Sequence, residues 1–187
     1  MNKKIDNLKA QLLKLLKKEA FRKGGIVLSS GKVSSFYIDG RRVTLTAKGA
    51  YLVAYLILDL LKGQKIEAVG GPTLGADPIA GALAVMSFIK KKPLKTFIIR
   101  KAPKLHGARR QIEGPDLKTG SRLVLVDDVA TSGRSLLDSI GILRNEGFQV
   151  DTAIVIVDRQ EGAIEAFAQK NCQLISLFTP RDFGIQP

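Results

Sequence analysis

The sequence is poor in the residues that mark several large classes of protein. Among its 187 residues it has no tryptophan, one histidine and one cysteine. Cys172 cannot form a disulfide within the chain, which argues against a disulfide-stabilised secreted domain and predicts a reducing cytoplasm. The longest apolar run, residues 50–58, is far shorter than the ~20 residues that cross a bilayer, and the basic N-terminus lacks the apolar stretch of a signal peptide. We therefore expect a cytoplasmic protein without membrane contact.

Acidic residues are scarce relative to basic ones. The chain has 17 Asp and Glu against 30 Lys and Arg, a formal charge of +13. This excess permits a nucleic-acid partner, but aromatic residues make up only 6% of the chain and offer few platforms for stacking bases. We expect a small polyanionic substrate and no nucleic acid, because the basic residues lie in scattered clusters: Lys3-Lys4, Lys17-Lys18, Arg41-Arg42, Lys90 to Lys92 and Arg109-Arg110.

The length, composition and pattern of the chain predict one globular domain of the α/β class. A chain of this length with 45% hydrophobic residues can bury one core. We expect a single domain over residues 1–187, with an N-terminal helix and hairpin over about 1–45 and an α/β core over about 46–178. Short apolar runs alternate with helical periodicity through the core, which predicts a mostly parallel sheet flanked by helices.

One stretch, residues 122–137, carries the clearest chemistry. Leu123 to Val126 form an apolar run typical of a buried parallel strand. We expect this strand to end at Asp127 and Asp128, before the small turn Thr131-Ser132-Gly133 and a following helix. The helix N-terminus offers free backbone N–H groups and a positive dipole end, so the turn is a candidate anion site. The carboxylates beside it can accept sugar hydroxyls, which points to a phosphorylated sugar; the alternative is an ordinary turn with Thr131 or Ser132 as helix cap.

The acids followed by V-A-T-S-G resemble the 5-phosphoribosyl-1-pyrophosphate (PRPP) signature of type I phosphoribosyltransferases. A P-loop and a dinucleotide fingerprint are excluded, since neither glycine pattern occurs. The resemblance implies a type I phosphoribosyltransferase-like fold, with a mostly parallel central sheet flanked by helices and a small N-terminal hood. It also implies a set of PRPP-binding residues: Thr73, Arg100, Lys101, Lys104, His106, Asp127, Asp128, Val129, Ala130, Thr131, Ser132, Gly133, Arg134 and Ser135.

The N-terminal region predicts a helix and a hairpin. Residues 3–19 carry apolar side chains at helical spacing, opposite lysines, and we expect Gly24-Gly25 to end this unit. Short β-like runs at 26–28 and 36–38 flank a turn and predict an antiparallel hairpin. Its pattern S-G-K-x-S-x-F-Y-x-D resembles the hood of orotate phosphoribosyltransferases, which implies that Phe36 and Tyr37 contact orotate; the alternative is a generic exposed hairpin.

The middle of the chain supplies two loops of interest. We expect a helix over 46–62 capped by Thr46, a strand over 66–69, a loop over 70–78 and a helix over 79–89. In the family the 70–78 loop binds pyrophosphate through its main chain. A strand over 95–100 is followed by a polar segment to Gly114 that carries the only histidine and has no regular pattern.

R-K-x-x-K-x-H-G in that segment is similar to the mobile catalytic loop of orotate phosphoribosyltransferases. The resemblance implies that Lys101, Lys104 and His106 act as catalytic residues together with Asp127 and Asp128. Such a lid would neutralise the pyrophosphate and exclude water. Mg²⁺ is the implied cofactor, bound mainly through PRPP and not directly by side chains. A lone histidine on a loop is otherwise most often a surface residue.

The C-terminal part of the chain continues the alternation of strands and helices. We expect a buried strand over 150–157, a helix over 163–170 and a strand over 172–178. The strand over 150–157 is followed by the pattern D-R-x-E-G, which resembles the corresponding segment of the family. In that family the arginine binds the orotate carboxylate, which implies this role for Arg159. The resemblance also implies that Thr131 contacts orotate. The alternative is a surface arginine paired with Asp158 or Glu161.

The resemblance implies an orotate phosphoribosyltransferase, which makes orotidine 5′-monophosphate and pyrophosphate from orotate and PRPP in pyrimidine biosynthesis. It also implies a homodimer whose active sites are shared between subunits. Two positions depart from well-known enteric members, since Ser29 and Leu74-Gly75 replace lysine-bearing positions. A phosphoribosyltransferase for another base, such as a purine, and a PRPP-sensing regulator that binds nucleic acid remain the alternatives.

Overall fold

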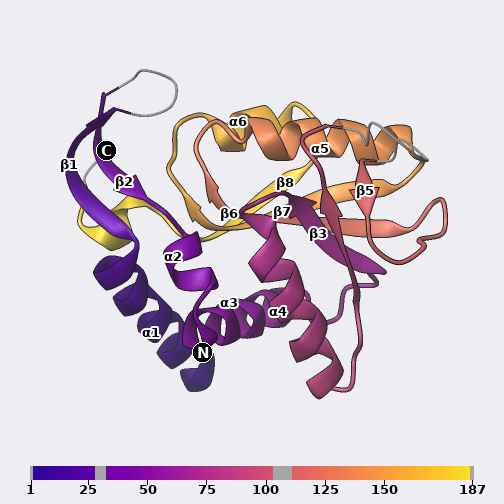
Figure 1. Ribbon diagram of the computed structural model, residues 1–187, viewed down its shortest axis with the longest axis horizontal. Coiled ribbons are helices and arrows are strands. Elements are labelled where there is room, and N and C mark those ends of the chain that lie inside the picture. The colour runs from indigo at the N-terminus through magenta and orange to yellow at the C-terminus, as the bar shows by residue number, and fades with distance from the viewer. Residues whose placement is uncertain (1, 28–32, 103–110, 186–187) are drawn as a thin grey trace.

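The computed structural model describes residues 2–27, 33–102 and 111–185 (Figure 1). Lys104, His106 and Ser29 lie outside these described residues. The helices and strands are α1 (Lys3–Glu19), β1 (Phe21–Val27), β2 (Val33–Ile38), α2 (Arg41–Thr44), α3 (Ala47–Leu60), β3 (Ala68–Pro72), α4 (Ala76–Ile89), β4 (Lys95–Ile99), β5 (Ile112–Glu113), β6 (Arg122–Ala130), α5 (Arg134–Asn145), β7 (Gln149–Asp158), α6 (Ala163–Ala168), β8 (Gln173–Phe178) and a 3₁₀ turn at Pro180–Phe183.

A six-stranded sheet with the order β5-β4-β3-β6-β7-β8 forms the centre. Its strands are parallel except for β5, which pairs with β4 in the antiparallel sense. The mostly parallel sheet predicted from the sequence is therefore confirmed. The chain moves outward from β3 to β4 and later returns to the other side of β3 with β6. Ligands of open α/β sheets bind at such a reversal, beyond the carboxyl ends of the strands.

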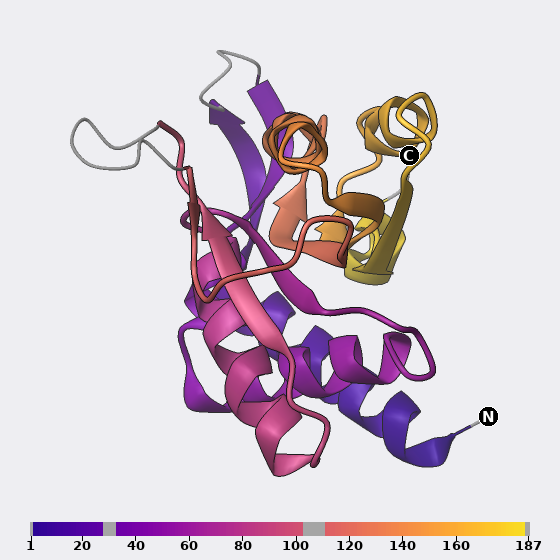
Figure 2. The same ribbon diagram turned by 90° about the vertical axis from the view of Figure 1, so that its right-hand side faces the viewer.

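Helices cover both faces of this sheet (Figure 2). In Figure 2, α5 and α6 lie on one side, and α1, α3 and α4 lie on the other. Successive residues of β6 point to opposite faces: Val124 and Val126 join the core cluster under α3 and α4, while Leu123 and Leu125 join the cluster under α5. Both faces are buried, which explains why this strand reads as a continuous apolar run.

The N-terminal hairpin of β1 and β2, the hood, packs beside the sheet and not above its centre (Figure 1). The Phe21 ring lies 6.2 Å from that of Phe36 and stacks on Phe183 at 5.3 Å between centroids, so the hood is held by the end of the chain. Gly24 and Gly25 do not end the helical unit as expected. They lie inside β1, where the pairing register shifts between Lys23 and Ile26, because an extended strand tolerates glycine at a bulge.

Several predicted boundaries were wrong near the carboxyl ends of the strands. The strand expected to end at Asp127 continues to Ala130, because its neighbour β7 also continues and supplies pairing partners as far as Asp158. The strand expected over 66–69 is Ala68–Pro72, and the helix expected from 79 begins at Ala76, since a proline fits within the first turn. The segment expected to be irregular contains the short strand β5.

The first hairpin strand, expected over 26–28, begins five residues earlier at Phe21, and the other helices and strands agree with the expectations to within three residues. Thr46 caps α3 by accepting a hydrogen bond from the Gly49 N–H at 3.1 Å. The short helix α2 was not expected. In the part of the chain that the structure describes, none of the helices has the length and apolar character that a membrane crossing requires.

Candidate active site

Asp127 and Asp128 lie near the carboxyl end of β6, at the reversal of strand order. Each carboxylate accepts a hydrogen bond from the next backbone N–H, at 2.9 Å in both cases, which fixes the two side chains. Glycines from two other segments pack against them. A Cβ atom on Gly40 would lie 2.7 Å from the Asp128 Cβ, and one on Gly75 would lie 2.5 Å from an Asp128 carboxylate oxygen. The acid pair is therefore enclosed on sides that only glycine allows.

Burial raises the pKa of both carboxyl groups. For Asp127 the pKa lies well above the ordinary aspartate value, first because the group is desolvated and then because Asp128 repels its negative charge. For Asp128 burial also raises the pKa, while the Val129 N–H and the Arg41 charge oppose the shift. The pair thus holds a proton to higher pH than isolated aspartates do, and it is ready to give that proton up when a hydrogen-bond donor or a cation arrives.

The turn after β6 forms a small concave anion site. Gly133 has φ +71° and is the N-cap of α5, so the predicted alternative of Thr131 or Ser132 as the cap is wrong. A Cβ atom on Gly133 would lie 2.6 Å from the Phe167 ring, which leaves no room for a side chain. A cavity of about 150 Å³ opens here over the first turn of the helix, where backbone N–H groups have no partner within the helix. It is lined by Asp127, Val129, Ala130, Thr131, Ser132, Gly133, Arg134, Ser135 and Leu136.

A second cavity, of about 190 Å³, joins the β3–α4 loop to the segment after β4. The Thr73 hydroxyl donates to the Asp77 carboxylate at 2.7 Å. The other Asp77 oxygen is buried and has no hydrogen-bond partner among the described residues. Arg100 and Lys101 place positively charged side chains at this cavity, and both residues are exposed. The lining of this cavity is Pro72, Thr73, Ile99, Arg100, Lys101, Gln111, Ser135, Asp138, Ser139 and Ile142.

Arg159 lies just beyond the end of β7, and its backbone N–H donates to the Ala130 carbonyl at 2.9 Å. Only 3% of its side chain is exposed. Its guanidinium donates from Nε to Glu161 Oε1 at 2.9 Å and stands 4.4 Å from the centre of the Phe36 ring. The alternative of a surface arginine is wrong, although the pairing with Glu161 that it foresaw is present. Tyr37, the next hood residue, is half-buried.

The structure thus brings together most of the predicted residues that it describes, from five separate segments. Thr73 and Arg100 lie at one cavity, the 127–135 stretch at the next, and Phe36 reaches Arg159 from the hood. Lys104 and His106 fall outside the described residues. Ser135 lines both cavities and links them.

Sequence reasoning missed Arg41. This residue begins α2 and donates to Asp39 from Nε at 2.9 Å and from Nη2 at 3.1 Å. Its charge also lowers the pKa of Asp128, so Arg41 acts as a counter-charge to the acid pair. Arg41 further lines an open hollow of about 550 Å³ with Leu74 and Asp77. The signal available in the sequence was the acid–glycine–arginine order directly after a strand.

The carboxylates near the acid pair suit a hard cation such as Mg²⁺ that binds together with a phosphorylated ligand. In the described ranges 2–27, 33–102 and 111–185, no three or more His, Cys, Asp or Glu side chains are arranged to hold a metal ion. The Asp127 and Asp128 carboxylates and the second Asp77 oxygen offer oxygen atoms near one another, but not as one group that could hold a metal ion by itself. Mg²⁺ favours such oxygens, keeps several of its waters and shares substrate phosphates, so these residues fit Mg²⁺ carried by a pyrophosphate.

Comparison with known proteins identifies the family. Residues 45–186 match the family model described as "Phosphoribosyl transferase domain". The chain is 44% identical over 178 residues to the orotate phosphoribosyltransferase of Synechocystis sp., covering 95% of this chain and 89% of that protein. It is 41% identical over 184 residues to the orotate phosphoribosyltransferase of Rhodopirellula baltica, covering 95% of each chain.

Solved structures support the same family assignment. The Mycobacterium tuberculosis orotate phosphoribosyltransferase in complex with PRPP superimposes with a TM-score of 0.79 at 31% identity, covering 95% of this chain and 99% of that one. The adenine phosphoribosyltransferase of Leishmania donovani, with a TM-score of 0.68 at 17% identity, shares the fold. The chain therefore belongs to the phosphoribosyl transferase family, in the branch whose curated members are named orotate phosphoribosyltransferase.

Proposed function

We propose that the chain is an orotate phosphoribosyltransferase, which transfers the 5-phosphoribosyl group of PRPP to N1 of orotate and releases pyrophosphate. The relatives support this activity, and one observation within the molecule carries the choice of base. A buried arginine, Arg159, lies against the Phe36 ring at the end of a strand that adjoins the acid pair. A flat ring with a carboxylate matches an aromatic face beside a guanidinium.

The 5′-phosphate of PRPP fits the cavity over the first turn of α5. Backbone N–H groups and the positive end of the helix dipole attract the phosphate there without a basic side chain. The ribose then extends from this turn toward Asp127 and Asp128, whose carboxylates accept hydrogen bonds from the two ring hydroxyls. These donors favour the ionised carboxylates and offset the burial that raises their pKa.

The pyrophosphate reaches the second cavity, because Ser135 lines both. Breaking the bond between C1′ and pyrophosphate leaves an electron-poor ribosyl carbon and adds negative charge to the leaving group. Arg100 and Lys101 stabilise that charge, together with Lys104 and His106 from the adjoining segment. The Asp127 and Asp128 carboxylates lie beneath the ribose, where their negative charge stabilises the positive ribosyl centre.

Mg²⁺ bound to PRPP would neutralise charge on the pyrophosphate, and Asp127, Asp128 and Asp77 would contact it through its water molecules. Orotate is oriented by Arg159, which holds its carboxylate, and by the Phe36 ring. Thr131 follows Ala130, whose carbonyl binds the Arg159 backbone, so Thr131 can reach the same base. N1 of orotate, after it has lost its proton to solvent, then attacks C1′ on the face opposite the pyrophosphate, so that the N1–C1′ bond forms as the bond from C1′ to the pyrophosphate oxygen breaks.

Residues 1–187 form one domain in this proposal, because a single apolar cluster includes residues of α1, the hood, α3, α4 and the sheet. The cytoplasmic location remains a prediction based on the single buried thiol. The purine alternative finds no added support in the structure, since the resemblance to an adenine enzyme extends to the fold alone.

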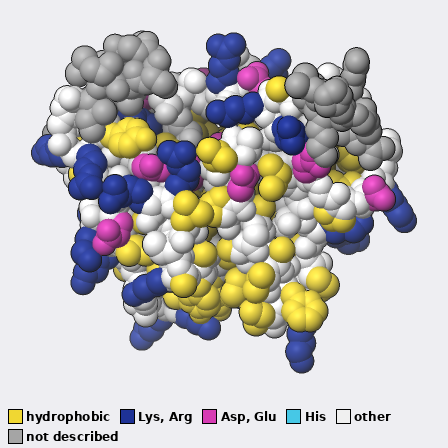
Figure 3. Space-filling view, viewed as in Figure 1, with side chains coloured by type: hydrophobic (Ala, Val, Ile, Leu, Met, Phe, Trp, Pro, Cys, Tyr) yellow, Lys and Arg dark blue, Asp and Glu magenta, His cyan; other side chains and the backbone are white. Residues whose placement is uncertain are grey.

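The homodimer is supported by apolar surface over α3 and α4. Figure 3 shows hydrophobic side chains gathered on the lower part of this face. The exposed members on α4 include Val85 at 61%, Phe88 at 75% and Ile89 at 63%. Leu74 of the active-site loop, two residues before α4, is 61% exposed as well, so the exposed apolar surface includes residues near both ends of α4. A second copy of the chain that covers it would bury both the patch and one side of the pyrophosphate loop.

Mixing two inactive variants tests whether the active sites are shared. A Lys104→Ala chain and an Asp128→Asn chain, denatured together and refolded, should regain about a quarter of the wild-type activity, because half of the dimers are mixed and each has one intact site. No recovery in a verified mixed dimer would contradict a shared site.

A panel of bases tests the reaction itself. With PRPP and Mg²⁺ present, pyrophosphate release should require orotate and should not occur with adenine, guanine or hypoxanthine. Release with a purine would favour the enzyme alternative. Salt-dependent nucleic-acid binding together with no turnover on any base would favour the regulatory one.

A further inference from the structure

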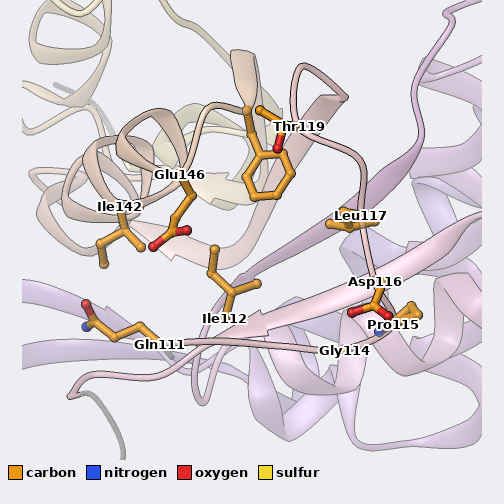
Figure 4. A pocket seen from close by; sticks show the side chains of 10 residues that line it. Gln111, Ile112, Gly114, Pro115, Asp116, Leu117, Thr119, Ile142 and Glu146 are labelled. Carbon is orange, nitrogen blue, oxygen red and sulfur yellow. The ribbon is translucent and has the colours of Figure 1, made fainter. Parts of the chain in front are cut away.

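A third cavity lies outside the active site, between the segment that follows β5 and the C-terminal end of α5 (Figure 4). Its volume is about 430 Å³, which lies within the range of ordinary small-molecule sites. Figure 4 shows Glu146 and Ile142 extending toward it from the helix, and Ile112 from the strand below. The lining is Gln111, Ile112, Gly114, Pro115, Asp116, Leu117, Thr119, Ile142, Glu146 and Phe148.

Backbone hydrogen bonds hold the walls of this cavity in place. The Gly120 N–H donates to the Gly147 carbonyl at 2.9 Å, which ties the loop before β6 to the turn after α5. The Phe148 N–H donates to the Leu143 carbonyl at 3.1 Å. Lys95 Nζ anchors the Asp116 backbone carbonyl at 2.9 Å. These bonds fix the segments on both sides of the cavity relative to each other.

The lining has a charge opposite to that of the chain. The protein carries +13, yet among the described residues that line this cavity the charged ones are Asp116 and Glu146; Lys95, which lies outside the lining, donates to the Asp116 backbone carbonyl and to Glu67. Ile112, Leu117, Ile142 and Phe148 supply an apolar wall. Carboxylates at an apolar wall suit a small organic cation, which places its protonated amine or amidinium at the acids and its apolar body against the wall.

The cavity shares a wall with the active site. Gln111 and Ile142 line both this cavity and the one that contains Thr73, Arg100 and Lys101. Gln111 is also bonded to Arg100 twice: its carbonyl accepts the Arg100 backbone N–H at 2.8 Å, and its side-chain amide donates to the Arg100 carbonyl at 3.3 Å. A ligand that moves Gln111 must therefore move the backbone that carries the pyrophosphate cations.

From this geometry we infer that the cavity between β5 and α5 is a regulatory site for a small organic cation with an apolar body. Its occupancy changes the affinity of the chain for PRPP through the Gln111–Arg100 contact. Because coupling between two sites is reciprocal, PRPP changes the affinity for the cation by the same factor.

The first test measures binding alone, so its outcome does not depend on the proposed reaction. Benzamidine is the probe, and neutral benzamide of nearly the same shape is its control, each titrated into the ¹⁵N-labelled full chain. We expect saturable amide shifts at 111–119 and 142–148, and about fivefold tighter binding of benzamidine, as exposed carboxylates provide. Equal affinities, or shifts elsewhere, would overturn the site.

The variants Glu146→Gln and Glu165→Gln form a matched pair of exposed carboxylate changes. Glu146→Gln should reduce the difference between benzamidine and benzamide, while Glu165→Gln, on α6 and not among the lining residues, should leave it unchanged. Loss of the difference in both variants would mean that general charge, and not this cavity, attracts the cation.

The second test measures coupling by calorimetric titration of PRPP with Mg²⁺, with and without saturating benzamidine. We expect the PRPP dissociation constant to change about fivefold or more in the wild type, at the lower end of typical allosteric coupling. In Glu146→Gln at the same benzamidine concentration the change should shrink. An unchanged constant in the wild type would overturn the regulatory role, and an equal change in Glu146→Gln would assign the effect to the active site.

Discussion

The two halves of the active site are built in different ways. The proposed PRPP half is centred on one continuous stretch, 127–136, whose backbone turn and paired carboxylates follow directly from the end of a strand, with Thr73, Arg100 and Lys101 at the adjoining cavity. The proposed orotate half joins two side chains from distant parts of the chain, Phe36 of the hood and Arg159 after β7. The first half depends on a backbone turn with no room for a side chain at Gly133, and the second depends on a buried arginine that contacts Glu161 and Phe36.

This difference teaches why one fold can serve several bases. The strand-to-helix turn is part of the sheet architecture, and the fold similarity to an adenine phosphoribosyltransferase extends across 91% of this chain. The hood contributes the Phe36 ring, 4.4 Å from the Arg159 guanidinium, and neither residue is part of a strand of the six-stranded sheet. Substitutions should therefore affect the halves separately, PRPP affinity on one side and orotate affinity on the other.

The largest expected effect is that of Arg159→Lys. Lysine keeps the charge but loses the planar fork and its stacking on Phe36, so kcat/KM for orotate should fall by roughly 10² to 10³. The PRPP dissociation constant should stay within about threefold of wild type, because Arg159 does not line either phosphate cavity. Steady-state kinetics and PRPP titration measure the two effects. An equal loss in both quantities would mean that the halves are not separate.

Gly133→Ala should break the PRPP half. The left-handed φ of +71° and the closeness of the Phe167 ring, 2.6 Å from the added Cβ, both oppose a side chain. We expect the free energy of unfolding to fall by about 2–4 kcal/mol and PRPP binding to weaken. The measurements are urea denaturation and PRPP titration.

Gly141→Ala is the matched control for Gly133→Ala. It lies in the same helix, and its added Cβ would meet nothing within 4 Å. It should raise the free energy of unfolding by up to about 1 kcal/mol, because alanine favours a helix interior. A Gly133→Ala protein as stable as this control would contradict the tight turn.

The turn over 127–133 was easier to predict from the sequence than the contact between Arg159 and Phe36, because the turn is local and the contact is not. Acids, hydroxyls and glycine stand in order along 127–133, so their proximity needs no tertiary information. That Arg159 would be buried under Phe36 could not be derived from either segment alone, and a surface pairing remained open. Arg41 was missed because its role depends on Gly40 packing against Asp128, a contact between distant segments.

Errors in the boundaries also have a physical pattern. Strands were expected to end at the first polar or glycine residue, yet β3 includes Gly70 and Gly71 and β6 includes both acids. A neighbouring parallel strand stabilises such residues in extended form, and the sequence alone does not show which strand is the neighbour. The catalytic assignment of Lys104 and His106 stays a prediction, as does the full set of site residues.

The pH dependence of PRPP binding should separate the halves further. In the proposed complex PRPP hydroxyls donate to ionised carboxylates, and the pKa of the Asp127–Asp128 pair is raised. Affinity should therefore increase with pH, by up to about tenfold per pH unit, until the pH exceeds that raised pKa. Without ligand the sign is opposite: the pair's contribution to the free energy of unfolding decreases as pH rises from the ordinary aspartate range through the raised pKa.

Calorimetric titration of PRPP at several pH values measures this effect, with Asp127→Asn as the control, because PRPP itself also titrates. The variant should retain the dependence due to PRPP and lose the part due to the carboxylate pair. Identical pH profiles in the wild type and the variant would contradict the role of the pair.

Glu161→Gln should give the smallest effect. Glu161 accepts from Arg159 but has 41% of its side chain exposed, so removing its charge should raise KM for orotate about fivefold. Neither kcat nor the PRPP dissociation constant should change by more than about twofold. A drop in kcat without a change in KM would show that Glu161 acts on the chemical step and not by positioning Arg159.

The central claim is that the two halves form one site for PRPP and orotate, and orotate absorbance tests it most directly. When PRPP and Mg²⁺ are added to the protein with orotate, the absorbance should fall as orotidine 5′-monophosphate forms, with one pyrophosphate released for each orotate consumed. Arg159→Lys should show the same fall only at much higher orotate concentration. No fall with verified, folded protein at any orotate concentration would contradict the account.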